Sequence, residues 1–374
     1  MRIVVAPDSF KESMSAVEAG AAIEAGIRRV WPEADVTCLP MSDGGEGLVR
    51  VLTPALGGEL VEATVADCLG RPCRATYGWA ADQRLAVIEV AEAVGLQQIP
   101  VAERDPLGAS TEGVGELLRE ALDRGATRIV VGLGGSATTD GGSGMLRALG
   151  MRFLDADGAE LRPGGGNLVG LAQIDTTDLD PRLSEVRVEV ASDVNNPLLG
   201  DQGSAAIFAP QKGASPEQVE HLEAGLARLA HLSALAGEDL SEAAGAGAAG
   251  GLGFAFLRYL GATIRPGVDT VIEATGYEEA LEYADYVFTG EGSIDAQSSS
   301  GKAPWGVATR AARRGIPVVG FAGRVAIEVD DSPFSAVVPI LRSLSTLEEA
   351  LRDGEANLKS AAELTCRLLA AAPR

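Results

Sequence analysis

The residues of this chain that could carry out chemistry stand in five short segments, each directly after an apolar run typical of a buried strand. These segments are DSFK (8–11), SDGG (42–45), GGSATTDGG (134–142), SDVNN (192–196) and EGSIDAQSSSGK (291–302). Ligands of open α/β sheets bind outside the carboxyl ends of the strands. Ordinary turn chemistry explains one or two segments rich in Gly, Asp and Ser. Five segments of similar composition predict a binding site.

These residue types suit phosphate. Glycine lets backbone N–H groups surround phosphate oxygens, and hydroxyl groups add donors. Mg²⁺ prefers one or two carboxylates together with phosphate oxygens and water, and a lysine neutralises charge on a moving phosphoryl group. We therefore interpret GLGGSATTDGG (132–142) as a phosphate cradle, whose candidate binding residues are Gly134, Gly135, Ser136, Thr138 and Asp140. The alternative is a glycine-rich turn packed under a helix.

The composition narrows the class of protein. With 374 residues, 46% hydrophobic and 4% aromatic residues and 47 glycines, the chain suits an α/β protein of two domains. A formal charge of −22 argues against nucleic acid or an anionic membrane as a partner. The first residues hold too short an apolar run for a signal peptide, and no run is long enough to span a membrane. We expect a cytoplasmic protein that handles a small metabolite.

Cysteine and histidine add little chemistry. The four cysteines, at positions 38, 68, 73 and 366, include no Cys-x-x-Cys pair and are expected to be free thiols. His221 and His231 lie ten residues apart in a helix-like segment and would point in different directions. A site built on histidine is therefore not expected.

Strand and helix patterns alternate at both ends of the chain. Strands are expected at RIVVAP (2–7), DVTCLPM (35–41) and YVFTG (286–290), and Ser15 with Glu18 has the spacing of a capping box. From about Glu59 a hairpin pattern replaces this alternation. We expect residues 1–55 and 266–374 to form one Rossmann/flavodoxin-like parallel-sheet α/β domain. A second α/β domain with a mixed sheet, residues 56–265, would interrupt it.

Two stretches imitate a dinucleotide-binding fingerprint. GAGAAG (245–250) has the G-x-G-x-x-G spacing but follows no strand, so a packing surface or helix start is favoured. GLGGSA (132–137) does follow a strand, yet the motif should run straight into a helix. Residues 138–142 are poor helix formers, and a helix is expected to start near Ser143. No Walker A motif is present.

Taken together, the chain resembles the type I glycerate kinase family. The resemblance rests on APDSFKES (6–13), SDGGEG (42–47), GLGGSATTDGG (132–142), SDVNNPL (192–198), GAAGGLG (247–253) and TGEGSIDAQSSSGK (289–302), in this order. It implies ATP-dependent phosphorylation of D-glycerate with Mg²⁺, usually giving 2-phosphoglycerate and in some members 3-phosphoglycerate. It also implies two α/β domains with the active site in the cleft between them. One departure is Cys68, where the family pattern has proline.

Lysines and acids receive candidate roles from this chemistry. Lys11 is the candidate for stabilising charge on the transferred phosphoryl group, and Asp8 shares its segment as a further catalytic candidate. Lys302 could bind the nucleotide phosphates. The alternatives are a lysine that covers apolar surface and a solvated helix start.

Asp193 is the candidate that orients the glycerate hydroxyl and accepts its proton, and Asp43 is its rival. Asp295 and Glu291 are candidate Mg²⁺ ligands, directly or through water. Helix capping and Asx-turns are the alternative for each of these acids.

Arg71 or Arg324 could form a bidentate pair with the carboxylate of glycerate, or be a surface arginine. Ser9 and Asn195 are further substrate-binding candidates. Two other functions remain open, a nicotinamide-dependent dehydrogenase and an anion-binding protein without catalysis. The phosphorylated hydroxyl and the oligomeric state, with a homodimer as one option, also remain open.

Overall fold

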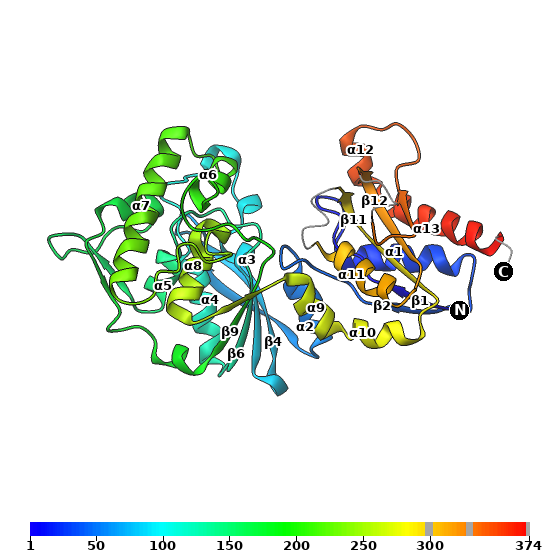
Figure 1. Ribbon diagram of the computed structural model, residues 1–374, viewed down its shortest axis with the longest axis horizontal. Helices are drawn as coiled ribbons and strands as arrows, with labels where there is room; N and C mark the ends of the chain where they lie inside the picture. Colours follow the sequence, from blue (N-terminus) through cyan, green and yellow to red (C-terminus); the bar gives the residue numbers. More distant parts are fainter. Residues whose placement is uncertain (296–301, 327–331, 372–374) are drawn as a thin grey trace. The chain divides into compact units, whose positions relative to one another are not determined.

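The computed structural model describes residues 1–295, 302–326 and 332–371, and its chain divides into two compact units (Figure 1). Unit 1 contains Met1–Asp43 and Pro266–Arg374, and unit 2 contains Gly44–Arg265. The first boundary lies earlier than the one expected after residue 55. The reason is helix α2 (Leu48–Ala55), which packs against the first three strands of unit 2.

Unit 1 is built on a five-stranded sheet whose neighbouring strands are all parallel. Its strands are β1 (Arg2–Val5), β2 (Asp35–Cys38), β11 (Tyr286–Ile294), β12 (Val318–Val325) and β13 (Ala336–Pro339). The spatial order β13-β12-β11-β1-β2 corresponds to 2-1-3-4-5 when the strands are counted within the unit. This is the flavodoxin-like order, in which ligands bind where the chain direction across the sheet reverses. That switch point lies between β1 and β11.

Helices of unit 1 cover the sheet. They are α1 (Ala16–Arg28), α9 (Gly267–Thr275), α10 (Tyr277–Ala280), α11 (Ala303–Arg313), α12 (Leu347–Arg352) and α13 (Gly354–Ala371). The expected capping box starts α1, since the Ser15 hydroxyl accepts from the Glu18 N–H and the Glu18 carboxylate accepts from the Ser15 N–H. Helix α1 packs closely on α13, because a Cβ at Gly26 would lie 2.5 Å from the Lys359 carbonyl oxygen.

Unit 2 contains a six-stranded mixed sheet and a two-stranded ribbon. The sheet order is β10 (Thr263–Arg265), β9 (Arg187–Ala191), β6 (Arg128–Gly132), β5 (Leu85–Glu89), β4 (Pro72–Ala80) and β3 (Glu59–Ala66). Strands β3 and β4 form the expected hairpin, and β5, β6, β9 and β10 run parallel. The ribbon pairs β7 (Arg152–Leu154) with β8 (Gln173–Asp175).

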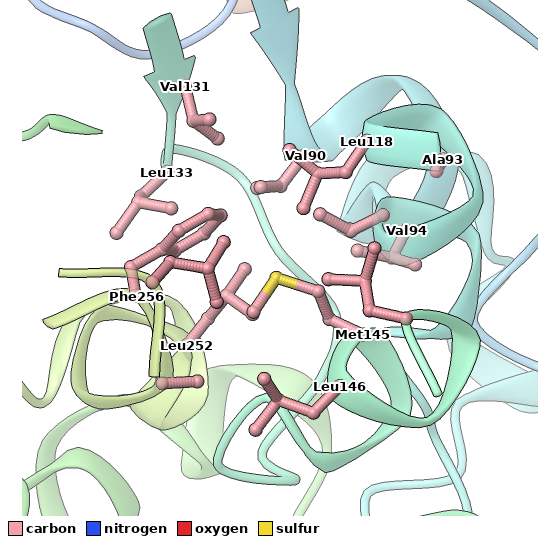
Figure 2. Close-up of a cluster of buried hydrophobic side chains, with 14 of the residues drawn as sticks. Val90, Ala93, Val94, Leu118, Val131, Leu133, Met145, Leu146, Leu252 and Phe256 are labelled. Carbon is pink, nitrogen blue, oxygen red and sulfur yellow. The ribbon is translucent and has the colours of Figure 1, made fainter. Parts of the chain in front are cut away.

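The core of unit 2 forms where helices meet strand β6. These helices are α3 (Val90–Val94), α4 (Glu112–Asp123), α5 (Ser143–Ala148), α6 (Ser204–Phe208), α7 (Pro216–Leu235) and α8 (Ala248–Leu260). Figure 2 shows Val90, Leu118, Val131, Met145 and Phe256 pointing toward one another, and all five are buried. Helix α5 begins at Ser143, as expected. The segment between β6 and α5 is therefore held from two sides by packed elements.

All four cysteines are free thiols, as expected. Among the described residues, no helix is long and apolar enough to cross a membrane.

Candidate functional site

The carboxyl edge of the unit 1 sheet gathers acids at its switch point. Asp8 follows β1, and its N–H donates to the Gly290 carbonyl on β11 at 2.9 Å. Its side chain is buried, and one carboxylate oxygen accepts from the Ser9 N–H at 2.6 Å. Burial raises the pKa of Asp8 well above its usual value, and the charges of Asp43 and Glu291 raise it further. The Asp8 carboxylate is therefore held near two other acids.

Two lysines lie at the same edge. Lys302, the residue that precedes α11, donates from Nζ to the buried Glu291 carboxylate at 3.0 Å. Lys11 is exposed, and its charge opposes the rise in the pKa of Asp8. The structure thus brings together Asp8, Lys11 and Asp43 with the Glu291–Lys302 pair. Acids and cations at one sheet edge can bind both metal and phosphate.

The remaining candidates of unit 1 lie at the end of β11 and on its neighbour. Asp295 ends the described part of the segment 291–302, and its carboxylate accepts from the Ser293 hydroxyl at 3.1 Å. Arg324 is exposed on β12, in register with Ser293. Ser9 is partly buried. Residues 296–301 of this segment lie outside the described residues.

In unit 2, the segment between β6 and α5, residues 132–142, is here called the glycine loop. Its open part lies near Gly135, which is exposed and has φ +75°. From Ser136 to Gly142 every residue is buried. The backbone of the buried part is anchored, because the Ala137 N–H donates to Val94 and the Gly141 N–H to Gly250. The loop therefore has an open half and a packed half.

Asp140 belongs to the packed half and has no exposed area. Its carboxylate accepts from the Thr111 N–H and hydroxyl, both at 2.9 Å, and from the N–H groups of Gly142 at 3.1 Å and Gly144 at 3.0 Å. Burial raises the pKa of Asp140, and these four hydrogen bonds oppose the rise. The carboxylate thus fastens the start of α5 to the residue before α4, which differs from the binding role expected for it in the phosphate cradle.

The lack of large side chains in the glycine loop follows largely from protein packing. A Cβ at Gly134 would lie 2.5 Å from the Cα of Gly45, and one at Gly142 would lie 2.4 Å from the Cβ of Ala255. From the other side, a Cβ at Gly250 would lie 1.9 Å from the Thr138 carbonyl oxygen. Gly250 belongs to the GAGAAG stretch, which is therefore a packing surface. For Asp140, Gly141 and Gly142 the packed-turn alternative describes the structure.

Asp193 and Asn195 follow strand β9, beside the glycine loop. Ala191 of β9 lies in register with Gly132 of β6, so both segments leave the same edge of the sheet. Asp193 is partly buried and Asn195 is exposed. Gly44 also approaches this edge, since its Cβ would lie 2.7 Å from the Ala191 carbonyl oxygen. Unit 2 thus gathers at one edge two of the predicted segments and the two glycines, Gly44 and Gly45, that end a third.

Comparison with known proteins identifies the chain's relatives. A model of the glycerate kinase family matches residues 3–370. The chain belongs to the glycerate kinase family. It is therefore an ATP-dependent kinase, a phosphotransferase. As a kinase it uses ATP as a substrate.

Its curated relatives match over most of their length. The chain is 50% identical to the glycerate kinase of Bacillus subtilis, over 87% of this chain and 85% of that protein. It is 44% identical to the glycerate 2-kinase of Escherichia coli, over 96% and 95%. A crystal structure from Salmonella typhimurium, described as glycerate kinase 2, matches with a TM-score of 0.87 and 47% identity, over 99% and 98% of the two chains.

One candidate residue that the sequence patterns did not reveal is Lys212, which ends the short 3-10 helix Pro210–Lys212. Its Nζ donates to the Thr138 carbonyl at 2.5 Å and to the Ser136 hydroxyl at 3.2 Å, beneath the glycine loop. The residue is buried, which lowers the pKa of Lys212 to about 7. The rarity of lysine could have drawn attention to Lys212, because only four of the 31 Lys and Arg residues are lysines.

Arg71 is already engaged in the structure. Its Nε donates to the Asp67 carboxylate at 2.7 Å, and its Nη1 donates to the Glu103 carboxylate at 2.7 Å. The two acids hold the guanidinium in the β3–β4 turn region. This pairing favours Arg324 over Arg71 as the arginine for a substrate carboxylate.

Proposed function

We propose that this glycerate kinase transfers the γ-phosphoryl group of ATP to the C2 hydroxyl of D-glycerate, giving 2-phosphoglycerate, with 3-phosphoglycerate as the less favoured product. The observation that carries the proposal is the group of acids and lysines at the unit 1 switch point, on a chain whose relatives are named glycerate kinases. The relative named glycerate 2-kinase favours the C2 hydroxyl.

The proposed step transfers the γ-phosphoryl group from ATP to glycerate and leaves ADP as the second product. The hydroxyl oxygen of glycerate attacks the γ-phosphorus, the bond to the oxygen that bridges the β- and γ-phosphorus breaks, and ADP leaves. Asp193 accepts the hydroxyl proton, with Asp43 as the rival base. Lys11 and Lys302 stabilise the charge that spreads over the phosphoryl oxygens. These residues come from both units, so we propose that both units act on one ATP.

The residues present fit Mg²⁺ by their chemistry. Among the described residues, no three His, Cys, Asp or Glu side chains form a ready-made metal site. Mg²⁺ usually takes one or two carboxylates and completes its shell with phosphate oxygens and water. Glu291 and Asp295 are the proposed carboxylates, and the bound ion would neutralise phosphate charge. Asp8 lies beside Glu291, so its own charge would also be offset.

The arginine that would hold the substrate carboxylate is Arg324, and Ser9 and Asn195 are the proposed hydrogen-bonding partners of the substrate. The open half of the glycine loop, at Gly134 and Gly135, would receive nucleotide phosphates together with Ser136, the first residue of the buried half. Gly135 exposes its backbone there, which supports this proposal. Thr138 would add its hydroxyl, which is buried and has no hydrogen-bond partner within the described part of the chain.

A substrate panel tests the function. The purified protein with MgATP is offered D-glycerate, L-glycerate, glycolate and lactate, and ADP release is followed. We expect turnover with D-glycerate far above that with the other acids. ADP release that no hydroxy acid stimulates would contradict the proposal.

Two variants test the proposed roles in the same assay. Lys11→Ala and Asp193→Ala should each lower kcat and kcat/KM together, by roughly two to four orders of magnitude, because their side chains would act in the transition state. Lys359→Ala, a lysine within helix α13, is the matched control and should keep its activity. A near-normal kcat in either variant removes that residue from the mechanism.

A further inference from the structure

Lys212 places a cation-forming group inside unit 2, beneath the first buried residues of the glycine loop, which directly follow the exposed Gly135. Its Nζ contacts two loop residues at once, the Ser136 hydroxyl at 3.2 Å and the Thr138 carbonyl at 2.5 Å. Only 3% of the residue is exposed, so water does not stabilise its charge. A buried lysine is rare unless it is paired or has a functional reason.

Few charged groups lie near Lys212. Asp140 of the glycine loop acts on it electrostatically, but the Asp140 carboxylate is already bound by four donors. Arg104 contacts the residue before Lys212, since its guanidinium donates to the Gln211 carbonyl at 3.1 Å. Helix α6, which packs against the short helix of Lys212, contains no charged residue. In the described part of the chain, the two hydrogen-bond partners of Lys212 Nζ are therefore uncharged loop atoms.

The protonation state of Lys212 controls what the Ser136 hydroxyl can do. A charged ammonium has three donors and no acceptor. The Ser136 oxygen must then accept from Nζ, and its own hydrogen is left to donate elsewhere. A neutral amine has a lone pair, so the Ser136 hydrogen can turn inward and donate to it. Only the charged form compels the hydroxyl to remain a donor for an anion on the open side of the loop, because the neutral amine also lets the hydrogen turn inward.

We propose that Lys212 is a positioning residue of the nucleotide site, which in its charged form directs the Ser136 hydroxyl toward the ATP phosphates and fixes Thr138 through its carbonyl. This proposal rests on the proposed function, in which the glycine loop receives those phosphates. The Thr138 hydroxyl supports it, because it is a buried donor without a partner in the described residues, on the residue whose carbonyl Lys212 holds.

Proton uptake on ATP binding follows from this arrangement. Burial lowers the pKa of Lys212 to about 7, so near neutral pH the free enzyme contains both forms. Bound phosphates favour the charged form and raise that pKa. Binding therefore takes up a proton, and the affinity for ATP falls as the pH rises above about 7.

Calorimetry tests the uptake directly. A nonhydrolysable MgATP analogue is titrated into the wild-type protein and into Lys212→Met, in two buffers with different ionisation enthalpies. Near pH 7 we expect uptake of roughly half a proton by the wild type and none by the variant. Equal uptake by both proteins, or none by the wild type, overturns the proposal. The wild-type measurement remains decisive if the variant does not fold.

Kinetics separates a positioning role from a purely structural one. Over roughly pH 6 to 9, the KM for ATP of the wild type should rise by up to about tenfold per pH unit above the Lys212 pKa. Lys212→Met should show a high KM with little pH dependence, while Ser136→Ala keeps Lys212 but loses the directed hydroxyl and should raise the KM. If both variants change only the melting temperature, the proposal is wrong.

The proposed function fails in a distinguishable way. If the wild-type protein binds the MgATP analogue with proton uptake that depends on Lys212, yet does not phosphorylate D-glycerate, the substrate assignment is wrong and the role of Lys212 stands. If D-glycerate is phosphorylated and Lys212→Met leaves the pH profile unchanged, the role of Lys212 is wrong and the function stands.

Discussion

Asp8 in unit 1 and Asp140 in unit 2 are both buried acids that follow a parallel strand, yet their surroundings differ. Counted over the described residues, Asp140 accepts hydrogen bonds from four donors, whereas Asp8 accepts one, from the Ser9 N–H, and lies near Asp43 and Glu291. A carboxylate surrounded by donors is stabilised by the fold and fastens it. A carboxylate held near like charges gains stability only when a cation arrives. The comparison favours a structural role for Asp140 and a chemical role for Asp8 in the proposed reaction.

Glu89 at the end of β5 lies between these extremes. It is buried, and its carboxylate accepts from the N–H groups of Gly47 at 2.9 Å and Val49 at 2.7 Å, at the start of α2. Burial raises the pKa of Glu89 to about 7. The three acids therefore form a series with one, two and four donors.

Replacing Asp8 should have the largest effect, and it should fall on catalysis. Asp8→Asn keeps the shape and removes the charge, so we expect kcat to fall by roughly two to four orders of magnitude. The unfolding free energy should not decrease, because the repulsion from Asp43 and Glu291 disappears. Steady-state kinetics and urea unfolding measure the two quantities. A variant with normal kcat would end the distinction between the two acids.

Replacing Asp140 should instead lower stability. In Asp140→Asn the amide cannot accept at every position, and buried donors of Thr111, Gly142 and Gly144 lose their partners. We expect a loss of roughly 2–4 kcal/mol in unfolding free energy, since each unpaired buried group costs about 1–3 kcal/mol. The folded fraction should keep a kcat within a few-fold of normal. Unchanged stability with lost activity would reverse the assignment.

Replacing Glu89 should change how the stability of the fold depends on pH. Its folded pKa of about 7 exceeds the ordinary value of 4.5, so the folded state binds the proton more tightly. The stability that this proton contributes is present below the ordinary value and is lost as the pH rises through about 7. Between acidic and neutral pH, the unfolding free energy of Glu89→Gln should therefore rise by roughly 1–3 kcal/mol relative to that of the wild type. Parallel stability curves for the two proteins would contradict this.

The smallest effect is expected at Arg71. Because Asp67 and Glu103 hold its guanidinium, Arg71→Ala should change the KM for D-glycerate by less than about threefold. Arg324→Ala is the matched comparison and should raise that KM by roughly ten- to a hundredfold, the value of a lost charged hydrogen-bond pair. The reverse pattern would show that Arg71 exchanges its partners for the substrate.

Local patterns in the sequence predicted much of the fold. Apolar runs marked the strands, Ser15 and Glu18 marked the start of α1, and the poor helix formers before Ser143 marked the start of α5. Four of the five segments follow the carboxyl ends of their strands, whereas β11 runs on to Ile294 and so contains Glu291 and Ser293 of the fifth segment. These features depend on residues a few positions apart, which is why spacing alone reveals them.

Contacts between distant residues were beyond such patterns. The local pattern made Asp140 a candidate of the phosphate cradle, and its actual partner Thr111, 29 residues away, lies outside that pattern. Lys212 was overlooked because the loop residues that it contacts lie 74 and 76 residues before it. Likewise, α2 was placed with the preceding strands, but its apolar face packs on the strands that follow it. In each case tertiary packing decided the role.

The central claim is that this glycerate kinase phosphorylates the C2 hydroxyl of D-glycerate, and proton-coupled phosphorus NMR of the product tests it most directly. The phosphorus of a phosphate on C2 couples to the single proton of that carbon. The phosphorus of a phosphate on C3 couples to the two protons of that carbon, with similar coupling constants. We predict a doublet from the product formed with D-glycerate and MgATP. A triplet-like signal would place the phosphate on C3, and the absence of any new phosphate ester would contradict the account as a whole.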